Sequence, residues 1–446
     1  MTDLGRRYAL WLEMTFDVLR ARRTAAIAIA IVAIGSVTEW LRLPAVARGT
    51  LWAEDARRFL NDASVVGPAK ALLIPYAGYL HTIPRLIAGF AVQFTPVNSW
   101  ADVMSGASCV VAAGVAALVF VCSRDVVQPI VPRILLASIT LLDPLSPHEV
   151  LGNAANLHWY FLWLSPWLLL YRPRSRTGAW ALGLVALLAS LTEIQLVFAT
   201  PLLAWRLRDR RRWPVRVPFA VGVLTQLIVT LADPRGTGPH PMIGLPSLAT
   251  GFLVNAVLPI VLPTSHAVGW TFAHGGPLIG IVLLLLFLAI AWWGFMHSQG
   301  PARWLFVALP LASMGLYAAA VEATPTGFSD YAAASAAQWT TPWIDRYGVV
   351  PSMLLLALIP IALGVLGPTT RTAHRMRWAG SVMLVVLLLA QFVPSSTRRD
   401  GGPLWSPQVS RATSLCESRP PSTVVPLAGA PGGTWLVHVQ CARLRG

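Results

Sequence analysis

Residues 277–297 read PLIGIVLLLLFLAIAWWGFMH, an apolar run without a single Asp, Glu, Lys or Arg. A run of about 20 apolar residues is long enough to cross the hydrocarbon core of a bilayer as one helix. Residues 24–43, TAAIAIAIVAIGSVTEWLRL, form a second run of this length near the N-terminus. We therefore expect helices that span a membrane to determine the fold.

The composition of the whole chain agrees with this expectation. Hydrophobic residues make up 55% of the 446 residues and charged residues only 12%, whereas soluble proteins are about a quarter charged. This composition excludes a disordered chain, a coiled coil, a small disulfide-rich secreted protein and an ordinary soluble enzyme. It predicts an all-α polytopic membrane protein whose main partner is the lipid bilayer.

Positive charge is placed unevenly along the chain. The formal net charge is +15, and Lys70 is the only lysine among 34 basic residues. The arginines gather where apolar runs end, which is typical of cytoplasmic loops and not of a nucleic-acid-binding surface. The intervening runs predict spans at 24–43, 99–122, 130–145, 154–171, 216–232, 277–297, 303–321, 348–367 and 378–393. Two short helices that meet near Glu193 are expected over 178–205, so the bundle has about 9–11 helices.

This topology divides the chain into two parts. Residues 1–393 form a transmembrane domain whose N-terminus is expected in the cytoplasm. Its first extracytoplasmic loop, 44–98, is long, and an amphipathic surface helix is expected there over Tyr79–Phe94. Shorter outward connections are expected at 143–153, 233–276 and 322–347.

Residues 394–446 are rich in Pro, Gly, Ser and Arg and predict a small extracytoplasmic tail domain. A strand is expected within it at Trp435–Val439. Because the compartment outside the cytoplasm is oxidising, we expect a disulfide between Cys416 and Cys441, the alternative being two free thiols.

No nucleotide-binding, zinc-protease or serine-hydrolase motif occurs, so candidate site residues come from polar groups in the outward loops. The first is the pair Glu54-Asp55, which follows the first span. In an adjacent carboxylate pair one pKa can rise, so that one group acts as a base and the other as an ion ligand. The alternative is a solvated acidic turn neutralised by Arg57 and Arg58.

Further polar groups lie in the later outward loops and beside the expected surface helix. The second group lies around 143–159, where amides, an imidazole and indoles suit the hydroxyl groups and the face of a sugar; helix capping and an interfacial aromatic belt are the alternative. The third precedes the span at 348–367, where an arginine beside a tyrosine can hold a phosphate; an ordinary interfacial anchor is the alternative. The candidate residues of these groups are Asp143, His148, Glu149, Asn153, Asn156, His158, Trp159, Asp345, Arg346 and Tyr347, with Tyr79 and Arg85 from the first loop. Glu39 and Glu193 are carboxylates in apolar surroundings, where either a function or simple capping would explain them.

Taken together, these features resemble the GT-C superfamily of integral membrane glycosyltransferases. The resemblance rests on the acidic pair in the first outward loop, the surface helix, Asp143 and Glu149 in the second loop, the hairpin at 178–205 and Asp345-Arg346-Tyr347. The resemblance covers most of residues 24–393 as architecture. It implies a bacterial plasma (inner) membrane enzyme, a hexosyl- or pentosyltransferase of cell-envelope or cell-wall biogenesis. Such enzymes move a sugar from a polyprenyl-phosphate carrier to a glycan, lipid or protein acceptor outside the cytoplasm.

The resemblance also implies roles for individual residues. An acid of the first loop takes the proton of the acceptor hydroxyl, so that transfer inverts the anomeric carbon, and Asp55 is the expected base with Glu54 orienting it. Arg346, Tyr347 and Arg85 are expected to meet the lipid phosphate. Some members bind a divalent cation, Mg²⁺ or Mn²⁺, and others need none; Glu54 and Asp55 would be its ligands. A transporter or lipid-linked sugar flippase and a non-catalytic envelope-assembly protein remain the alternatives.

Overall fold

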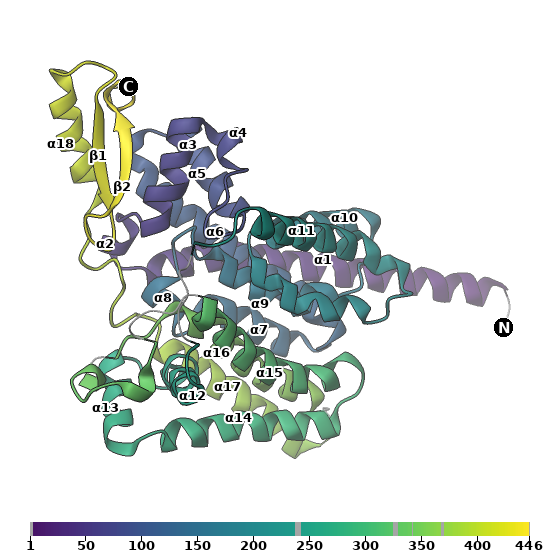
Figure 1. Cartoon of the computed structure of the whole chain (residues 1–446). Helices are drawn as coiled ribbons and strands as arrows, with labels where there is room; N and C mark the ends of the chain where they lie inside the picture. Colours follow the sequence, from purple (N-terminus) through teal and green to yellow (C-terminus); the bar gives the residue numbers. More distant parts are fainter. Residues whose placement is uncertain (1–2, 237–241, 324–328, 341, 367–369, 446) are drawn as a thin grey trace.

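The computed structural model describes residues 3–236, 242–323, 329–340, 342–366 and 370–445, with side chains from residue 21 onward (Figure 1). Within these residues, eight helices are long and apolar enough to cross a membrane, so the chain is a multi-pass, mainly helical membrane protein. Six of them correspond to α1 (Asp3–Arg42), α6 (Trp100–Cys122), α11 (Trp213–Ala232), α14 (Leu278–His297), α15 (Gly300–Ala323) and α17 (Arg371–Ala390). The other two are Ile130–Glu149, which joins α7 (Ile130–Leu142) to α8 (Ser146–Glu149), and Arg346–Val365, which contains α16 (Val349–Val365).

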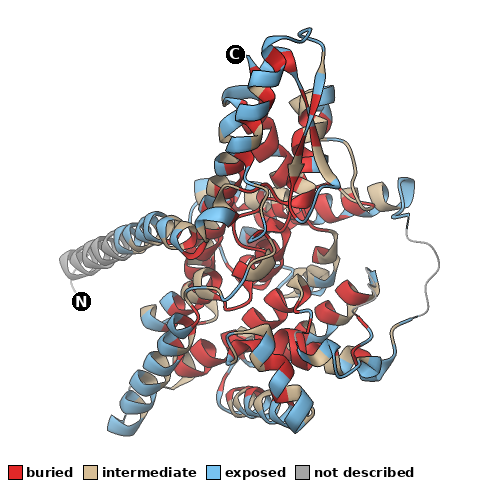
Figure 2. Cartoon of the chain, turned by 90° about the vertical axis from the view of Figure 1, so that its left-hand side faces the viewer, coloured by how far each residue is buried: buried red, intermediate tan, exposed pale blue. Residues whose placement is uncertain are grey.

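Burial differs between these helices although all of them are apolar. All but the last two residues of α16 are buried, and α16 packs against α7, α14, α15 and α17 near the centre of the bundle. In contrast, α14 and α17 are uniformly apolar at their centres yet mostly exposed, because their outer surfaces face lipid in a membrane. Figure 2 shows this contrast between the red interior and the pale outer helices.

Two short helices and a 3-10 segment lie among the long spans. The expected span at 154–171 is α9 (Leu157–Leu170), which is buried along its whole length. The expected hairpin is present as α10 (Arg176–Ser190) and the 3-10 segment η4 (Ile194–Ala204), with Glu193 capping η4 at the junction. The sequence therefore predicted both apolar segments of the hairpin and the break between them.

The connection at 233–276 differs from the expected plain loop. Its described part contains α12 (Leu245–Phe252), the π-helical turn η6 (Leu253–Val257) and α13 (Ser265–Gly275). Residues 245–260 are apolar enough to be buried, and Val254–Leu258 are fully buried against the bundle. Pro and Gly at several points of this segment keep the helices short.

The first loop and the tail form one unit at the same end of the bundle. The loop contains α2 (Ala45–Arg48), the π-helical turn η1 (Asp55–Leu60), α3 (Asn61–Val66), α4 (Pro68–Ala71) and the expected surface helix α5 (Thr82–Phe94). The tail contains α18 (Trp405–Glu417), β1 (Val424–Gly429), β2 (Trp435–Gln440) and α19 (Cys441–Leu444), with β1 and β2 antiparallel. The hairpin stands beside α3 and η1 in Figure 1, and β2 includes the expected strand.

Hydrogen bonds join the tail to the loop. The Trp405 indole donates to the Val97 carbonyl at 2.6 Å, and its ring stacks on Trp100 with the centroids 6.1 Å apart. The Ala430 N–H donates to the Leu51 carbonyl at 2.8 Å. These bonds hold the chain on both sides of Glu54 and Asp55.

Cys416 and Cys441 form a disulfide, the pairing expected from the sequence, with their Cα atoms 5.3 Å apart. Replacing both by Ser is expected to loosen the tail without displacing the spans. A bridge with a sequence separation of 25 stabilises its domain by about 3 kcal/mol in the chain-entropy model. Limited proteolysis of the detergent-solubilised protein should then cut the tail faster than in the wild type. Cys109→Ala, which removes a buried free thiol, is the control, and equal cleavage rates in all three proteins would contradict the expectation.

Candidate active site in a cavity beside the first loop

A cavity of about 360 Å³ opens where the first loop meets the bundle. Its walls come from the first loop, the start of α9, the junction before η4, the end of α11, the end of α15 and the start of α16. The polar and aromatic lining residues are Glu54, Tyr76, Tyr79, His81, Asn156, His158, Trp159, Glu193, Gln195, Thr230, Arg235, Arg346 and Tyr347. The cavity therefore gathers residues from all three of the polar groups that the sequence singled out.

Glu54 and Asp55 face different surroundings. Glu54 lines the cavity, and its Oε2 atom is buried with no hydrogen-bond partner among the described residues. Asp55 is 1% exposed, and its two carboxylate oxygens accept from the backbone N–H groups of Ala154 at 3.0 Å and Ala155 at 2.8 Å. Burial raises the pKa of Asp55 to about 7, while the two N–H donors act in the opposite direction. Asp55 therefore fixes the loop before α9, and Glu54 is the carboxylate that a ligand in the cavity would meet.

Asp55→Asn is expected to destabilise the protein, because an amide offers one acceptor oxygen where the carboxylate offers two. One buried N–H would lose its partner and face another donor, at a cost of about 1–3 kcal/mol. The melting temperature in detergent should fall for Asp55→Asn and stay at the wild-type value for Glu54→Gln. The same melting temperature for both variants would contradict the positioning role.

A buried histidine and a glutamate meet in the wall formed by α9 and the junction before η4. His158 Nδ1 contacts Glu193 Oε2, and Glu193 Oε1 accepts from the Gln195 N–H at 2.6 Å. The carboxylate thus holds the imidazole in one orientation, as in histidine–carboxylate pairs of many sites. The ring of Trp159 lies 4.5 Å from that of His158, and its indole nitrogen is buried without a partner among the described residues.

A tight turn brings two tyrosines to the cavity. The Tyr76 and Tyr79 backbones exchange hydrogen bonds of 2.9 and 3.2 Å, with Gly78 at φ +85° between them. A side chain at Gly78 would come within 3.0 Å of the backbone nitrogen of Arg235, so the turn needs glycine for both its conformation and its space. Tyr79 stacks on His81 with the ring centroids 4.1 Å apart. Burial lowers the pKa of His81 well below its usual value, which makes this ring a neutral platform.

Arg346 brings positive charge to the same cavity. Its Nη1 donates to Glu149 Oε1 at 2.6 Å, and this pair joins α16 to the second loop. Tyr347 lines the cavity beside it and meets Trp159 edge to face at 5.9 Å. Arg235, at the end of α11, adds a second guanidinium. The site thus has two arginines, two glutamates, two histidines and several aromatic rings, a set that suits a phosphate joined to a sugar.

The structure separates the other predicted residues from the cavity lining. Arg85 is buried, and its Nη1 donates to Asp62 at 2.9 Å, while Nε and Nη2 have no partner among the described residues. The carboxylate of Asp143 accepts from the Leu145 and Ser146 N–H groups and from the Ser352 hydroxyl, which makes it a buried cap. Both residues lie outside the cavity lining, where Arg85 joins α5 to α3 and Asp143 caps the second loop, and their contact with substrate stays a prediction.

Glu149, Asn153, Asp345 and His148 also lie outside the lining among the described residues. Glu149 stands behind Arg346, and its carbonyl accepts from the side-chain amide of Asn153, which in turn accepts from the Asn156 N–H at 2.9 Å. Asp345 accepts from the Tyr347 N–H at 3.0 Å and caps the turn before α16. We found no cavity contact for His148. Glu149, Asn153 and Asp345 contact residues that line the cavity, and their own contact with substrate stays a prediction.

Arg235 and Glu193 were not among the predicted site residues. Glu193 carried a signal, a carboxylate in an apolar hairpin, which capping explained equally well. Arg235 carried no such signal in the sequence, because a single arginine after a membrane span is common. Only the close approach of its backbone to the Gly78 turn places it in the cavity.

Among the residues described by the structure, no group of three His, Cys, Asp or Glu side chains lies where it could hold a metal ion. Asp55 accepts from two backbone N–H groups and Glu54 lines the cavity, so the two carboxylates proposed as metal ligands have different surroundings, and a cation at this pair stays a prediction. No protein-family model, curated protein or solved structure matches this chain.

Proposed function

We propose that the protein is a membrane glycosyltransferase that takes a sugar from a polyprenyl-phosphate carrier and passes it to a hydroxyl group of an envelope acceptor. The observation that carries this proposal is the cavity lining, in which Glu54, His158, Arg235 and Arg346 converge at the membrane end of the first loop. A carboxylate beside two guanidinium groups supplies a base and a phosphate site within one cavity. These are the two requirements of transfer from a sugar phosphate.

The apolar part of the lining supports a lipid-linked donor. The apolar lining includes Ile194, Val197 and Phe198 of η4 and Ala319, Ala320 and Ala323 of α15, and Phe198 is 58% exposed. A prenyl chain would lie between these two elements, with its phosphate at Arg346. The small alanines leave room for the chain, and the exposed Phe198 gives it an apolar surface at the entrance.

The chemistry proposed for the site is a single displacement. The acceptor hydroxyl oxygen attacks the anomeric carbon while the bond from that carbon to the phosphate oxygen breaks. Glu54 accepts the hydroxyl proton, and the released polyprenyl phosphate carries its negative charge at Arg346 and Arg235. His158, held by Glu193, and the Trp159 ring position the sugar. This reassigns the base from Asp55, which positions the loop, to Glu54.

The proposal includes a topology with nine crossings. The first loop and the tail are in contact, so they lie on the same side of the membrane and an even number of crossings must separate them. Seven long spans follow α1, and α9 must therefore cross the membrane as the eighth. Because α9 is buried throughout, its 14 residues need not match the bilayer thickness. We place the N-terminus in the cytoplasm of a bacterial cell, and the cavity and the tail outside, following the arginine distribution.

The test uses the purified protein in nanodiscs with a panel of polyprenyl-phosphate hexoses and pentoses and a cell-envelope extract as acceptor. Release of polyprenyl phosphate by the wild-type protein, together with label in the acceptor, would support transfer. Release with no donor of the panel would contradict it. Movement of the intact donor across the membrane of sealed vesicles, without release, would favour the flippase alternative.

A further inference from the structure

A second cavity, of about 620 Å³, lies at the opposite end of the bundle from Glu54. We call it the arginine pocket. It is lined by Ala21, Arg124, Asp125, Leu170, Arg172, Pro173, Arg174, Trp205, Arg206, Arg211, Arg212 and Pro301. Pro301 lies at the start of α15 and Ala323, which lines the first cavity, at its end. At 1.5 Å per residue the two cavities are about 30 Å apart.

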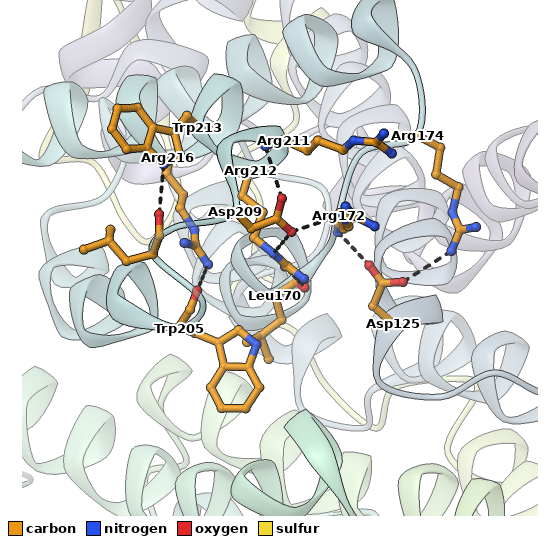
Figure 3. A network of polar contacts seen from close by, with 11 residues as sticks. Asp125, Leu170, Arg172, Arg174, Trp205, Asp209, Arg211, Arg212, Trp213 and Arg216 are labelled. Atoms are coloured by element: carbon orange, nitrogen blue, oxygen red, sulfur yellow. Dashed lines mark hydrogen bonds and ion pairs between the residues drawn. The ribbon is translucent and has the colours of Figure 1, made fainter.

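Positive charge exceeds negative charge in this pocket. Six arginines line it, and two carboxylates, Asp125 and Asp209, lie among them, which leaves a formal excess of +4 (6 − 2) in the described part of the chain. Figure 3 shows how the carboxylates are used: Arg174 pairs with Asp125 at 3.3 Å, and Arg172 and Arg212 pair with Asp209 at 3.0 and 3.3 Å. The guanidinium groups of the three remaining arginines of the lining, Arg124, Arg206 and Arg211, have no carboxylate partner among the described side chains, although the Arg211 backbone N–H donates to Asp209.

The backbone around the pocket is held firmly in place. The Arg212 guanidinium donates to the Leu170 carbonyl, and Arg216 donates to the Trp205 carbonyl, so α11 is tied to the ends of α9 and η4 (Figure 3). Arg206 has φ +48°, a left-handed conformation that costs free energy for any residue with a side chain. The ties therefore hold Arg206 in a conformation that the chain would otherwise avoid, at the rim of the pocket.

The pocket lies at the level where spans end. Asp125 follows α6, Leu170 ends α9, and Pro301 begins α15. Trp205 lines the pocket, and Trp213, half-exposed, lies beside it, as indoles do at the boundary between hydrocarbon and headgroups. A ligand here would come from the layer of lipid headgroups, and the excess positive charge selects a phosphate.

We propose that the arginine pocket binds the phosphate headgroup of an anionic phospholipid in the leaflet opposite the Glu54 cavity. Arg206 and Arg211 hold the phosphate, and Arg124 adds charge from the end of α6. Basic pockets between spanning helices are the usual sites for such headgroups. The proposal does not depend on glycosyl transfer, because no residue is shared between the two cavities.

The test measures lipid binding to the purified full-length protein by native mass spectrometry, with phosphatidylglycerol as anionic probe and phosphatidylcholine as neutral probe. The wild-type protein should retain phosphatidylglycerol preferentially. Arg206→Gln/Arg211→Gln should weaken its apparent affinity roughly 10- to 30-fold, since each arginine near a membrane surface contributes about one factor of five. The side chains of Arg206 and Arg211 are exposed, so the double variant should fold. Arg124→Gln is a second variant, which leaves both of these arginines intact.

Arg371→Gln/Arg375→Gln is the matched control, with the same loss of charge on exposed residues. These two begin α17, where residues 374 and 377 meet residues 131 and 132 at the end of the bundle that carries Arg124. The control should bind phosphatidylglycerol like the wild type. Equal weakening in the control and pocket variants, or no weakening in either, would overturn the proposal. Displacement of the lipid by inorganic phosphate at the same free concentration would overturn the assignment to a lipid.

Discussion

Glu54→Gln is expected to lower the rate of sugar transfer by a factor of roughly 10² to 10⁴ while leaving donor binding nearly unchanged. The amide keeps the size of the side chain but cannot accept the proton of the acceptor hydroxyl. That proton moves only in the transition state, so the loss should appear in kcat and not in the affinity for the donor. Steady-state rates of polyprenyl phosphate release, with donor affinity measured separately, check this expectation.

Two variants sharpen the test. Asp102→Asn removes an exposed carboxylate at the start of α6 and should transfer at the wild-type rate. His158→Gln removes another group of the cavity that could accept a proton, and we expect it to weaken sugar binding more than it lowers kcat. Full activity of Glu54→Gln together with a large loss of kcat in His158→Gln would move the base to the His158–Glu193 pair. Full activity of both would remove the cavity from consideration as the catalytic site.

Arg346→Gln is expected to weaken binding of the polyprenyl-phosphate donor roughly tenfold to a hundredfold. A hydrogen bond to a charged group is worth about 1.5–3 kcal/mol, and the lost charge is the one nearest the proposed phosphate position. Binding of polyprenyl monophosphate, followed by native mass spectrometry, isolates this contact from the sugar. Unchanged affinity for this lipid would contradict the role of Arg346.

Arg346 also neutralises Glu149, and its removal leaves a mostly buried carboxylate unpaired. Arg346→Gln/Glu149→Gln removes both charges and should recover stability without recovering donor affinity. Arg411→Gln, on the exposed face of α18, loses the same charge far from the cavity and should bind the donor normally. If the double variant regains both stability and affinity, the effect of Arg346 is structural only.

Local sequence patterns predicted much of the architecture. Apolar length and arginine placement located the spans, because both depend on the bilayer and not on neighbouring helices. The hairpin at Glu193 was predictable because a carboxylate interrupts two apolar runs. The helices within 245–260 were not, because their length matched neither a span nor a typical loop and only burial against the bundle explains them.

The division of labour at the site depended on contacts between distant segments. Nothing local distinguishes Glu54 from Asp55, and the difference arises from the two amides of Ala154 and Ala155, 99 and 100 residues away from Asp55. Similarly, the sequence made Asp143 a candidate site residue, whereas in the structure its carboxylate accepts from the hydroxyl of Ser352, 209 residues away. A sequence read alone identifies candidate polar groups, but it does not assign each of them a partner.

The attachment of the tail to the first loop sets an order of events during synthesis. Trp405 and Val97, which share a hydrogen bond, are separated by 308 residues. At about 5–20 residues per second, the ribosome reaches Trp405 roughly 15–60 s after it has made Val97. During this interval the loop that carries Glu54 lacks the hairpin and helix that cover it. A chaperone acting on the newly inserted chain would bind this exposed loop. A chain stalled before residue 405 would contain every cavity residue but would lack the tail that covers the loop.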